Sequence, residues 1–256
     1  MKKLITTLIL IPSLIWGITF ESDRMEDALP YVESGTWVLI DVDNTLFESS
    51  VQLGSAQWRG YIRTKAQKAG YSKPESEEVL DQFWLFVQPF IPVRLVDPNA
   101  LTFLQKTKAP VFALTARDPI ELKHTQKQID SLKVIFINPF PEKIALSTVH
   151  PALYEKGVIY CGENTKGEAL AAFFEATGQT PAQVVFIDDR WDQVNKLEAE
   201  LKELGIPFIG MRFSGADARV KAFDPDVADL QLSYLPKIIS DEEAKEIIHA
   251  TGHSQD

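Results

Sequence analysis

Cysteine is almost absent from this chain of 256 residues, and cationic residues are fewer than anionic ones. The single cysteine, Cys161, can form neither an intrachain disulfide nor a four-cysteine zinc site. Four histidines without an HExxH arrangement exclude a metalloprotease of the zincin type. Lys and Arg total 26 against 36 Asp and Glu, which gives a net charge of −10. Because duplex affinity relies on cations that neutralise phosphates, this balance predicts no nucleic-acid partner.

Long hydrophobic runs are also missing, with one exception at the start of the chain. Residues 1–3 are basic at two positions, residues 4–20 are mainly apolar, and acidic sequence begins at Glu21. This layout predicts a secretory signal peptide over residues 1–20, with a cleavage point near Gly17. An uncleaved N-terminal anchor is the alternative, since about 17 apolar residues is the lower limit for spanning a bilayer. Both interpretations predict an exported body, periplasmic or secreted, with no other membrane contact.

Short apolar runs recur through the body of the chain, and each is continuous where a half-exposed strand would alternate with polar residues. Continuous runs are typical of parallel strands that are buried on both faces. Segments with a helical pattern lie between them, at about 118–130, 166–177 and 190–204. We therefore predict an α/β fold with a doubly wound, mostly parallel sheet. The predicted strands are Trp37–Ile40, Val111–Leu114, Val134–Ile137, Val184–Ile187 and Pro207–Met211.

One interval interrupts this alternation, because residues 47–95 contain two helical patterns, at about 51–69 and 75–87, and no core strand. We interpret it as a helical cap insert that divides an α/β core made of residues 21–46 and 96–256. Its aromatic residues are predicted to pack the insert against itself or against the core more often than to bind a ligand. Residues 150–161 predict a hairpin. The pattern beyond residue 213 is compatible with three structures: a tail, a dimer contact or an extra layer on the sheet. The oligomeric state is not predicted.

Polar side chains follow three of the predicted strands at the point where each strand ends. In an open α/β sheet the ligand crevice lies outside the carboxyl ends of the strands, so these side chains are expected to converge. Taken singly, each has an ordinary explanation as a helix cap or a turn residue. Their joint order along the chain favours a functional site. The groups are Asp41-Val42-Asp43-Asn44-Thr45, Thr115-Ala116-Arg117 and Asp188-Asp189, with Lys166 at the start of the helix that precedes Asp188.

The order and spacing of these groups resemble the haloacid dehalogenase superfamily. Its four motifs have counterparts in the strand and D-x-D-x-T string ending at Thr45, in the strand ending at Thr115, in Lys166-Gly167, and in the acidic pair Asp188-Asp189. The resemblance covers about residues 36–46 and 97–212, and the insert lies where the superfamily often carries a cap domain. A narrower resemblance is to exported members grouped as a domain of unknown function. It rests on the export signal, on residues 162–167 and on residues 211–217.

The resemblance implies a role for each of these side chains. Asp41 would be the nucleophile that forms an aspartyl-phosphate, and Asp43 the general acid and base. Thr115 would donate a hydrogen bond to the phosphoryl group. Lys166 would neutralise charge on the nucleophile and the phosphate.

The implied cofactor is Mg²⁺, which suits a site made only of oxygen ligands. The resemblance assigns its binding to the carboxylates of Asp41 and Asp188 and to the main-chain carbonyl of Asp43. Asp189 and Asp192 would hold Lys166 or a metal-bound water.

These residues predict a magnesium-dependent phosphatase that hydrolyses a small phosphomonoester. An acid and base two positions after the nucleophile is absent from the dehalogenases and ion pumps of the superfamily, and its presence as Asp43 favours ester hydrolysis. Two alternatives stay open. A phosphotransferase would use the same site with an alcohol as acceptor, and an exported binding protein would use the fold without catalysis.

Overall fold

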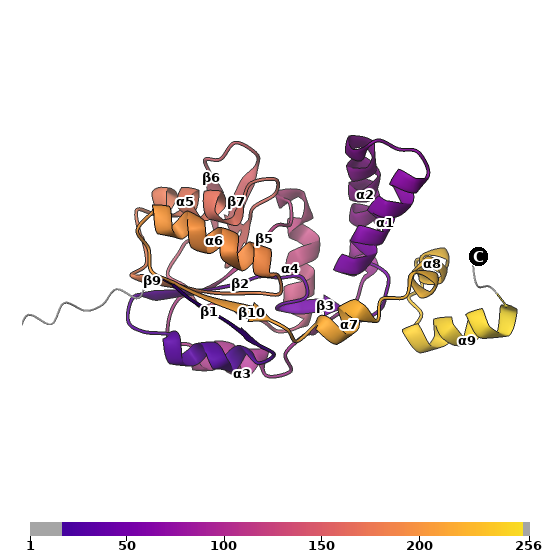
Figure 1. Cartoon of the computed structure of the whole chain (residues 1–256), viewed down its shortest axis with the longest axis horizontal. Helices are drawn as coiled ribbons and strands as arrows, with labels where there is room; N and C mark the ends of the chain where they lie inside the picture. Colours follow the sequence, from indigo (N-terminus) through magenta and orange to yellow (C-terminus); the bar gives the residue numbers. More distant parts are fainter. Residues whose placement is uncertain (1–16, 253–256) are drawn as a thin grey trace, which may run out of the picture.

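The computed structural model describes residues 17–252, in which an eight-stranded sheet forms the centre of the molecule (Figure 1). The strand order is β1-β10-β9-β2-β5-β8-β7-β6. Neighbours from β1 through β8 are parallel, while β7 is antiparallel to both β8 and β6. The strands of this sheet are β1 (Gly17–Ser22), β2 (Thr36–Ile40), β5 (Val111–Thr115), β6 (Lys143–Leu146), β7 (Ala152–Glu155), β8 (Val158–Tyr160), β9 (Gln183–Asp188) and β10 (Phe208–Phe213).

Helices cover both faces of the sheet, with α5 and α6 on one side and α3 on the other (Figure 1). The chain also forms short 3₁₀ segments at Met25–Tyr31, Gln88–Phe90 and Pro119–Glu121. The helices are α1 (Ala56–Lys68), α2 (Lys73–Val87), α3 (Ala100–Lys106), α4 (Leu122–Ser131), α5 (Lys166–Thr177), α6 (Trp191–Glu203), α7 (Asp217–Lys221), α8 (Pro225–Ser233) and α9 (Asp241–Thr251).

The central strand β2 is buried on both faces because its side chains alternate between two hydrophobic clusters. Trp37 and Leu39 pack with α5 and α6, whereas Val38 and Ile40 pack with α3 and the first 3₁₀ segment. A parallel strand with helices on each side needs apolar residues at every position, which explains its continuous run. The predicted fold class, an α/β fold with a mostly parallel sheet, is confirmed.

The predicted strand at residues 134–137 is wrong. This segment has no strand geometry, and the side chains of Ile135 and Ile137 are 74% and 66% exposed. The place beside β5 is taken by β8, whose hairpin partner is β7. The apolar run therefore crosses the surface beside the hairpin, and its contact with the sheet includes one hydrogen bond from Val111 N to Ile137 O.

Residues 1–16 of the predicted signal segment lie outside the described residues. The structure therefore does not test whether this segment is a cleaved peptide or an anchor. Its last positions, 17–20, belong to β1, which pairs with β10 from Gly17 opposite Phe208 to Ser22 opposite Phe213. The predicted signal peptide, which ends at residue 20, therefore overlaps the first four residues of β1. None of the helices within residues 17–252 is long and apolar enough to cross a bilayer.

Helices α1 and α2 stand apart from the sheet as a pair, between the short strands β3 (Phe47–Ser49) and β4 (Val93–Leu95). These two strands pair antiparallel, so the ends of the helical insert are joined to each other. Ser55 caps α1, and Ser72 with Glu75 forms a capping box at α2, which explains why each helix begins where it does. The two helices share a hydrophobic cluster around Trp58 and Trp84.

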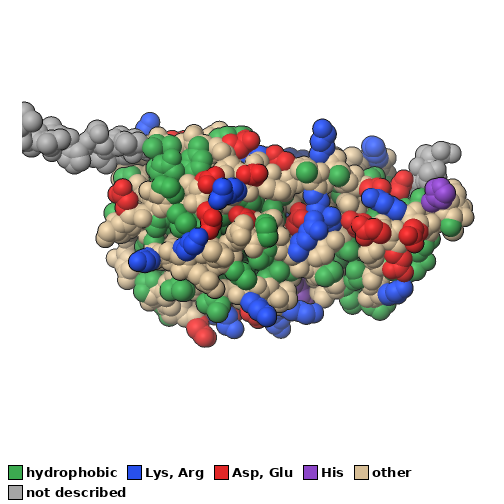
Figure 2. Space-filling view, turned by 90° about the horizontal axis from the view of Figure 1, so that it is seen from below, with side chains coloured by type: hydrophobic (Ala, Val, Ile, Leu, Met, Phe, Trp, Pro, Cys, Tyr) green, Lys and Arg blue, Asp and Glu red, His purple; other side chains and the backbone are tan. Residues whose placement is uncertain are grey.

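The C-terminal helices α7, α8 and α9 extend the molecule beside this insert (Figure 1). Ala228 of α8 belongs to the hydrophobic cluster of the insert, and Tyr61 Oη of α1 donates to Asp229 Oδ2 at 2.7 Å. On the face seen in Figure 2, acidic and basic side chains stand next to one another between hydrophobic ones. As far as residue 252, the C-terminal segment therefore packs against the insert and adds no strand or helix layer to the central sheet.

Candidate active site

The carboxyl ends of β2, β5 and β9 meet at one pocket of about 400 Å³. Asp41 follows β2, Thr115 ends β5 and Asp188 ends β9, and all three line the pocket. Lys166 is the first residue of α5, whose start is fixed by a capping box between Thr165 and Glu168. The structure thus brings together side chains that are far apart in the sequence, as strand ends at a topological switch point should be.

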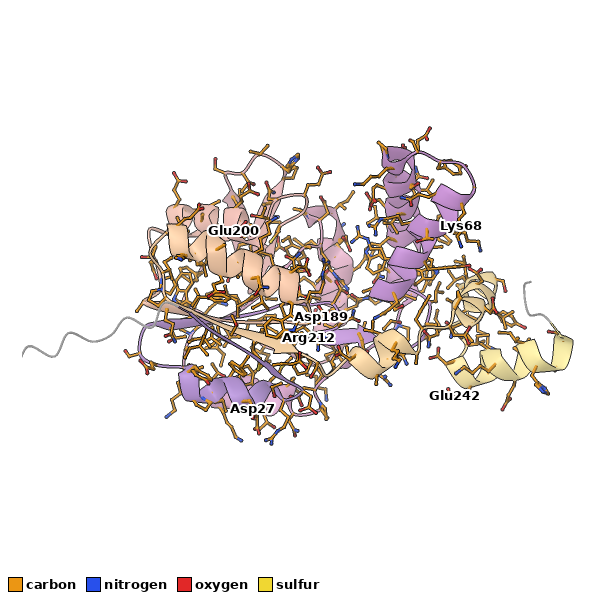
Figure 3. All side chains as sticks on the ribbon, in the orientation of Figure 1. Asp27, Lys68, Asp189, Glu200, Arg212 and Glu242 are labelled. Atoms are coloured by element: carbon orange, nitrogen blue, oxygen red, sulfur yellow. The ribbon has the colours of Figure 1, made fainter. Side chains whose placement is uncertain are left out.

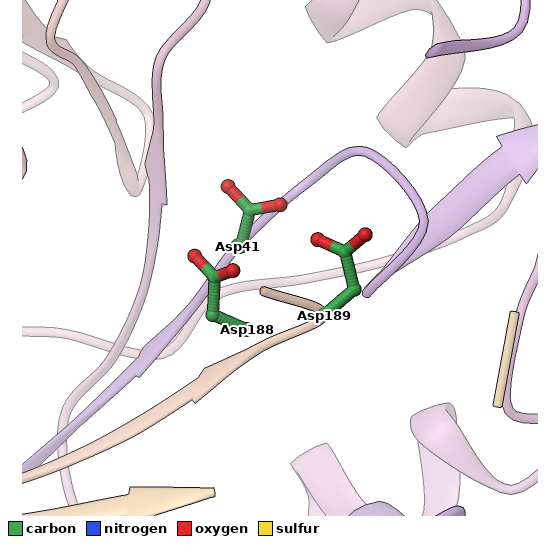
Figure 4. Close-up of side chains that lie close together, drawn as sticks. All are labelled: Asp41, Asp188 and Asp189. Carbon is green, nitrogen blue, oxygen red and sulfur yellow. The ribbon is translucent and has the colours of Figure 1, made fainter. Parts of the chain in front are cut away.

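Three carboxylates that line this pocket lie close together, those of Asp41, Asp188 and Asp189 (Figure 4). One oxygen from each of Asp41, Asp188 and Asp189 lies within 4.8 Å of the others. Burial raises the pKa of Asp41 well above its ordinary value, and the nearby charges of Asp188 and Asp189 raise it further against the effect of Lys166. Burial and the charge of Asp188 raise the pKa of Asp189 to about 7. Burial and mutual repulsion therefore disfavour full ionisation of these carboxylates.

Lys166 is the cation of this cluster. Its Nζ donates to Asp41 Oδ1 at 2.6 Å and also to Asp188 Oδ2, and the side chain is 5% exposed. Burial disfavours the charged form of this lysine, but the two carboxylates outweigh burial and raise its pKa above the ordinary value. A buried lysine held by two carboxylates stays charged, so it can neutralise an anion that enters the pocket.

Asp43 lines the same pocket and is paired with Arg117. Arg117 Nε donates to Asp43 Oδ2 at 2.9 Å, and Arg117 Nη2 donates to Asp43 Oδ1 at 2.7 Å. Burial would raise the pKa of Asp43, yet the charge and hydrogen bonds of Arg117 outweigh burial and hold it below the ordinary value. Arg117 also donates to Thr125 and Gln128, so the pair is fixed from the α4 side.

The turn that carries Asp41 and Asp43 is fixed by its own sequence and by the β9 loop. Asn44 has φ of 60°, a left-handed conformation that asparagine tolerates better than most residues. Thr45 accepts a hydrogen bond from Asp189 N at 2.9 Å, which joins the first acidic loop to the last. The threonine of the D-x-D-x-T string therefore positions the site, and nothing in its contacts gives it a chemical role.

The remaining predicted residues differ in their placement. Thr115 is 1% exposed and accepts a hydrogen bond from Arg117 N at 3.2 Å, at the wall of the pocket. Asp192 lies outside the acidic cluster, where it pairs with Arg190, and its side chain is 62% exposed. Lys166 donates to Asp41 and Asp188, so of the two roles predicted for Asp189 and Asp192, holding Lys166 or a metal-bound water, the first is filled by other carboxylates.

Two contacts at the pocket were not predicted from the sequence. Arg117 follows Thr115 by two residues at the same strand end, and this position was the available signal. Trp84 comes from α2 of the insert, lines the pocket, and donates through its indole N–H to the buried carboxylate of Glu121. That contact fastens the insert to the core over the pocket, and no local pattern around Trp84 predicts it.

The acidic cluster fits a divalent cation. Its converging ligand atoms are all carboxylate oxygens, which hard cations such as Mg²⁺ or Ca²⁺ prefer. Burial and mutual repulsion raise the pKa values of Asp41 and Asp189, and a cation bound between the carboxylates would oppose both effects. Asp41 and Asp188 are carboxylates that the sequence analysis named as metal ligands, and Asp189 is a third that lies with them.

Comparison with known proteins identifies a family and several relatives. The sequence profile of a family described as "Protein of unknown function (DUF2608)" matches residues 21–245. A putative outer membrane protein of Chlamydia pneumoniae is 24% identical over 87% of this chain and 86% of its own length. One of Chlamydia trachomatis is 26% identical over 84% and 82%, and an uncharacterised protein of Rickettsia prowazekii is 22% identical over 83% and 82%.

Solved structures give only distant likenesses. A haloacid dehalogenase-like hydrolase from Streptococcus pneumoniae matches with a TM-score of 0.41 and 13% identity, over 73% of this chain and 97% of its own. A hydrolase of the same family from Deinococcus radiodurans, with bound phosphate and sodium, matches with a TM-score of 0.39 and 12% identity, over 73% and 94%.

Proposed function

The chain belongs to the DUF2608 family of proteins of unknown function, and we propose that it is a metal-dependent phosphatase that transfers the phosphoryl group of a small ester to Asp41 and then to water. The observation that carries this proposal is the placement of Lys166, whose ammonium contacts Asp41 and Asp188 in the pocket that Thr115 also lines. These are the side chains that the haloacid dehalogenase resemblance assigns to phosphoryl transfer.

Phosphomonoesters resist hydrolysis in water, so a catalyst must supply a nucleophile and neutralise charge. The Asp41 carboxylate attacks phosphorus and the ester oxygen leaves, which divides one difficult step into two easier ones. Repulsion between this anion and the phosphate opposes the attack. Lys166 lowers that repulsion from its position 2.6 Å from Asp41. The hydroxyl group of Thr115 donates a hydrogen bond to a phosphoryl oxygen.

A divalent cation would be held by Asp41 and Asp188, with Asp189 beside them, and we propose Mg²⁺. When bound, it supplies the positive charge that the three carboxylates lack and that an incoming phosphate needs. Asp189 lies where it would hold a water bound to this cation, which is one of the two roles predicted for it from the sequence. Asp192 is too exposed, and too firmly paired with Arg190, to share it.

Asp43 acts as the base of the second half-reaction. The Arg117 pair keeps this carboxylate charged, and a charged carboxylate can take a proton from the water that attacks the phosphorylated Asp41. In the first half-reaction Asp43, in its protonated form, gives its proton to the leaving alcohol, and it regains that proton from the attacking water in the second. Good leaving groups depend least on this proton. Aryl phosphates have good leaving groups, so they are the best substrates for a first test.

The substrate is small. A pocket of about 400 Å³ is at the lower end of the usual range for small-molecule sites, and residues of α1 and α2 form part of its lining. The protein acts outside the cytoplasm. The basic and apolar start of the chain supports export, as do the relatives from Chlamydia that are named putative outer membrane proteins.

The test is release of phosphate from 4-nitrophenyl phosphate by the purified chain, with Mg²⁺, with a chelator, and as the Asp41→Asn variant. We expect release that requires the metal and that the near-isosteric substitution abolishes. Addition of acceptor alcohols separates the phosphotransferase alternative, which would give phosphorylated alcohol in place of free phosphate. A folded protein that releases no phosphate and does not respond to Mg²⁺ would contradict the proposal and favour the binding-protein alternative.

A further inference from the structure

One face of helix α1 forms the wall of the pocket above the acidic cluster. The residues of α1 that line the pocket are Ala56, Arg59, Gly60 and Arg63, whose spacing of three and four positions places them on one side of the helix. This wall carries two arginines. The floor of the pocket, by contrast, carries the carboxylates and Lys166.

Gly60 lies in the interior of α1, where a glycine costs about 1 kcal/mol relative to alanine. A Cβ at this position would meet no atom within 4 Å, so packing against the described residues does not explain the missing side chain. Its absence instead leaves open space at the pocket wall, between Arg59 and Arg63. Space of this kind beside two cations suits an anionic group.

The two arginines are held in place while part of their hydrogen-bonding capacity stays available. Arg59 Nη2 donates to Asp81 at 3.1 Å, and its guanidinium lies 5.3 Å from the centre of the Trp84 ring. Arg63 donates twice to Glu77. A guanidinium has five N–H donors, so each arginine keeps donors beyond those that fix it to α2.

A third arginine, Arg190, lines the same pocket from the residue before α6. A phosphomonoester with an uncharged tail is already matched by Lys166, Thr115 and the proposed cation. The arginines of α1 therefore exceed what a single phosphate needs, and they lie on a different wall from the groups that would bind it.

We propose that the substrate of this pocket carries a second oxyanion, a phosphate or a carboxylate, which Arg59 and Arg63 bind beside Gly60. The inference rests on the proposed function for the reacting phosphate. Arginine matches both kinds of oxyanion because its planar donors can form paired, charge-assisted hydrogen bonds with either.

The test compares three esters of one chain length: butyl phosphate, its counterpart with a terminal carboxylate, and butane-1,4-diol bisphosphate. We expect kcat/KM for at least one of the two-anion esters to exceed that for butyl phosphate about 30-fold, as charge-assisted hydrogen bonds would give. The better of the two identifies the second oxyanion. Equal efficiency on all three esters would overturn the inference.

Variants of α1 then locate the effect. Arg59→Gln and Arg63→Gln are each expected to lower the preference for the two-anion ester about tenfold, measured as the ratio of kcat/KM values within one variant. Gly60→Leu, which fills the open space, is expected to lower it as well. Lys68→Gln removes the same charge from the same helix at an exposed position away from Asp189 (Figure 3), and it should keep the ratio. An equal drop in Lys68→Gln would indicate general electrostatics and overturn the assignment.

A binding measurement separates this inference from the proposed function. Butane-1,4-bisphosphonate and butylphosphonate have P–C bonds that a phosphatase does not hydrolyse, and their affinities for the Mg²⁺-loaded chain can be compared by calorimetry. Tighter binding of the bisphosphonate, lost in Arg59→Gln, supports the second-anion site even if no ester is hydrolysed. Hydrolysis of every ester without preference, together with equal affinity for the two phosphonates, would refute this inference alone.

Discussion

Arg117 holds Asp43 through two hydrogen bonds, although the two residues are 74 positions apart in the sequence. The arginine is 3% exposed and lies 5.2 Å from the centre of the Phe47 ring, while the Asp43 side chain is 30% exposed at the pocket. A paired guanidinium positions the carboxylate and keeps it charged. The pair therefore fixes the position of Asp43 at the pocket and ties its chemistry to the stability of the fold.

Asp43→Asn is expected to lower both activity and stability. Asparagine cannot take the proton of water, so turnover should fall at least about 100-fold, in the range for loss of a general base. Arg117 would keep its buried charge without a carboxylate partner, which should cost about 3 kcal/mol of unfolding free energy. Urea unfolding measures this cost, and the double variant with Arg117→Gln should lose less than the sum of the two single variants. Additive losses would show that the ion pair contributes nothing.

The same pair gives a stability effect with a defined pH dependence. The pKa of Asp43 is lowered on folding from its ordinary value of 3.8, so its ionised form is stabilised by the native state. This contribution is fully present above pH 3.8 and is lost as the pH falls through the lower, folded-state pKa. The stability difference between the wild-type chain and Asp43→Asn should therefore be constant at neutral pH and shrink in stronger acid. A difference that grew on acidification would contradict the sign.

Metal binding should stabilise the chain through the acidic cluster. A cation that binds only the native state at 100 times its dissociation constant adds about 2.7 kcal/mol of stability. We expect Mg²⁺ to raise the melting temperature of the wild-type chain and to have little effect on Asp188→Asn. Asp192→Asn removes an equal charge from an exposed residue outside the cluster and should keep the response. A lost response in Asp192→Asn as well would show that the effect is not specific to the cluster.

The thiol of Cys161 should be unreactive in the folded protein. Burial raises its pKa to about 12, so at pH 8 almost none of it is thiolate, the form that reacts with alkylating reagents. We expect iodoacetamide to label the native chain at least about 100 times more slowly than the urea-unfolded chain. Fast labelling of the native protein would contradict a buried position.

Local patterns predict the sheet and most of the site because both depend on residues close to strand ends. The run from Trp37 to Ile40 has to be apolar when both faces of β2 are covered, and Asp41 has to follow it at the edge of the sheet. Residues 134–137 show the limit of this reasoning. Their run is equally apolar, but only the tertiary arrangement decides that β8 takes the place beside β5.

Contacts between residues that are distant in the sequence could not be predicted from local patterns for the same reason. Nothing around Arg117 in the sequence distinguishes a partner of Asp43 from an exposed strand-end arginine. The overlap of β1 with the predicted leader has a different cause, since one apolar stretch satisfies both an export signal and an edge strand. The D-x-D-x-T string locates the acidic loop, while the pairing of its second aspartate required the fold.

The C-terminal helices are expected to hold the insert over the pocket through buried polar contacts. Gln231 of α8 is fully buried, accepts a hydrogen bond from Leu53 N at 2.9 Å, and donates to Asp241 at 2.9 Å. Asp241 in turn accepts from Gln52 N, which is 189 positions away in the sequence. This network fixes the start of the insert, just before α1, to the end of the chain.

Gln231→Leu tests that arrangement. Leucine leaves the amide of Leu53 without a partner, and each buried group left unsatisfied costs about 1–3 kcal/mol, so we expect a loss of about 2–4 kcal/mol in urea unfolding. Gln67→Leu, at an exposed position of α1, is the matched control and should change stability little. Because α1 forms the wall of the pocket, a looser insert should also raise KM more than it lowers kcat. Equal effects of the two substitutions would mean that the C-terminal helices do not position the insert.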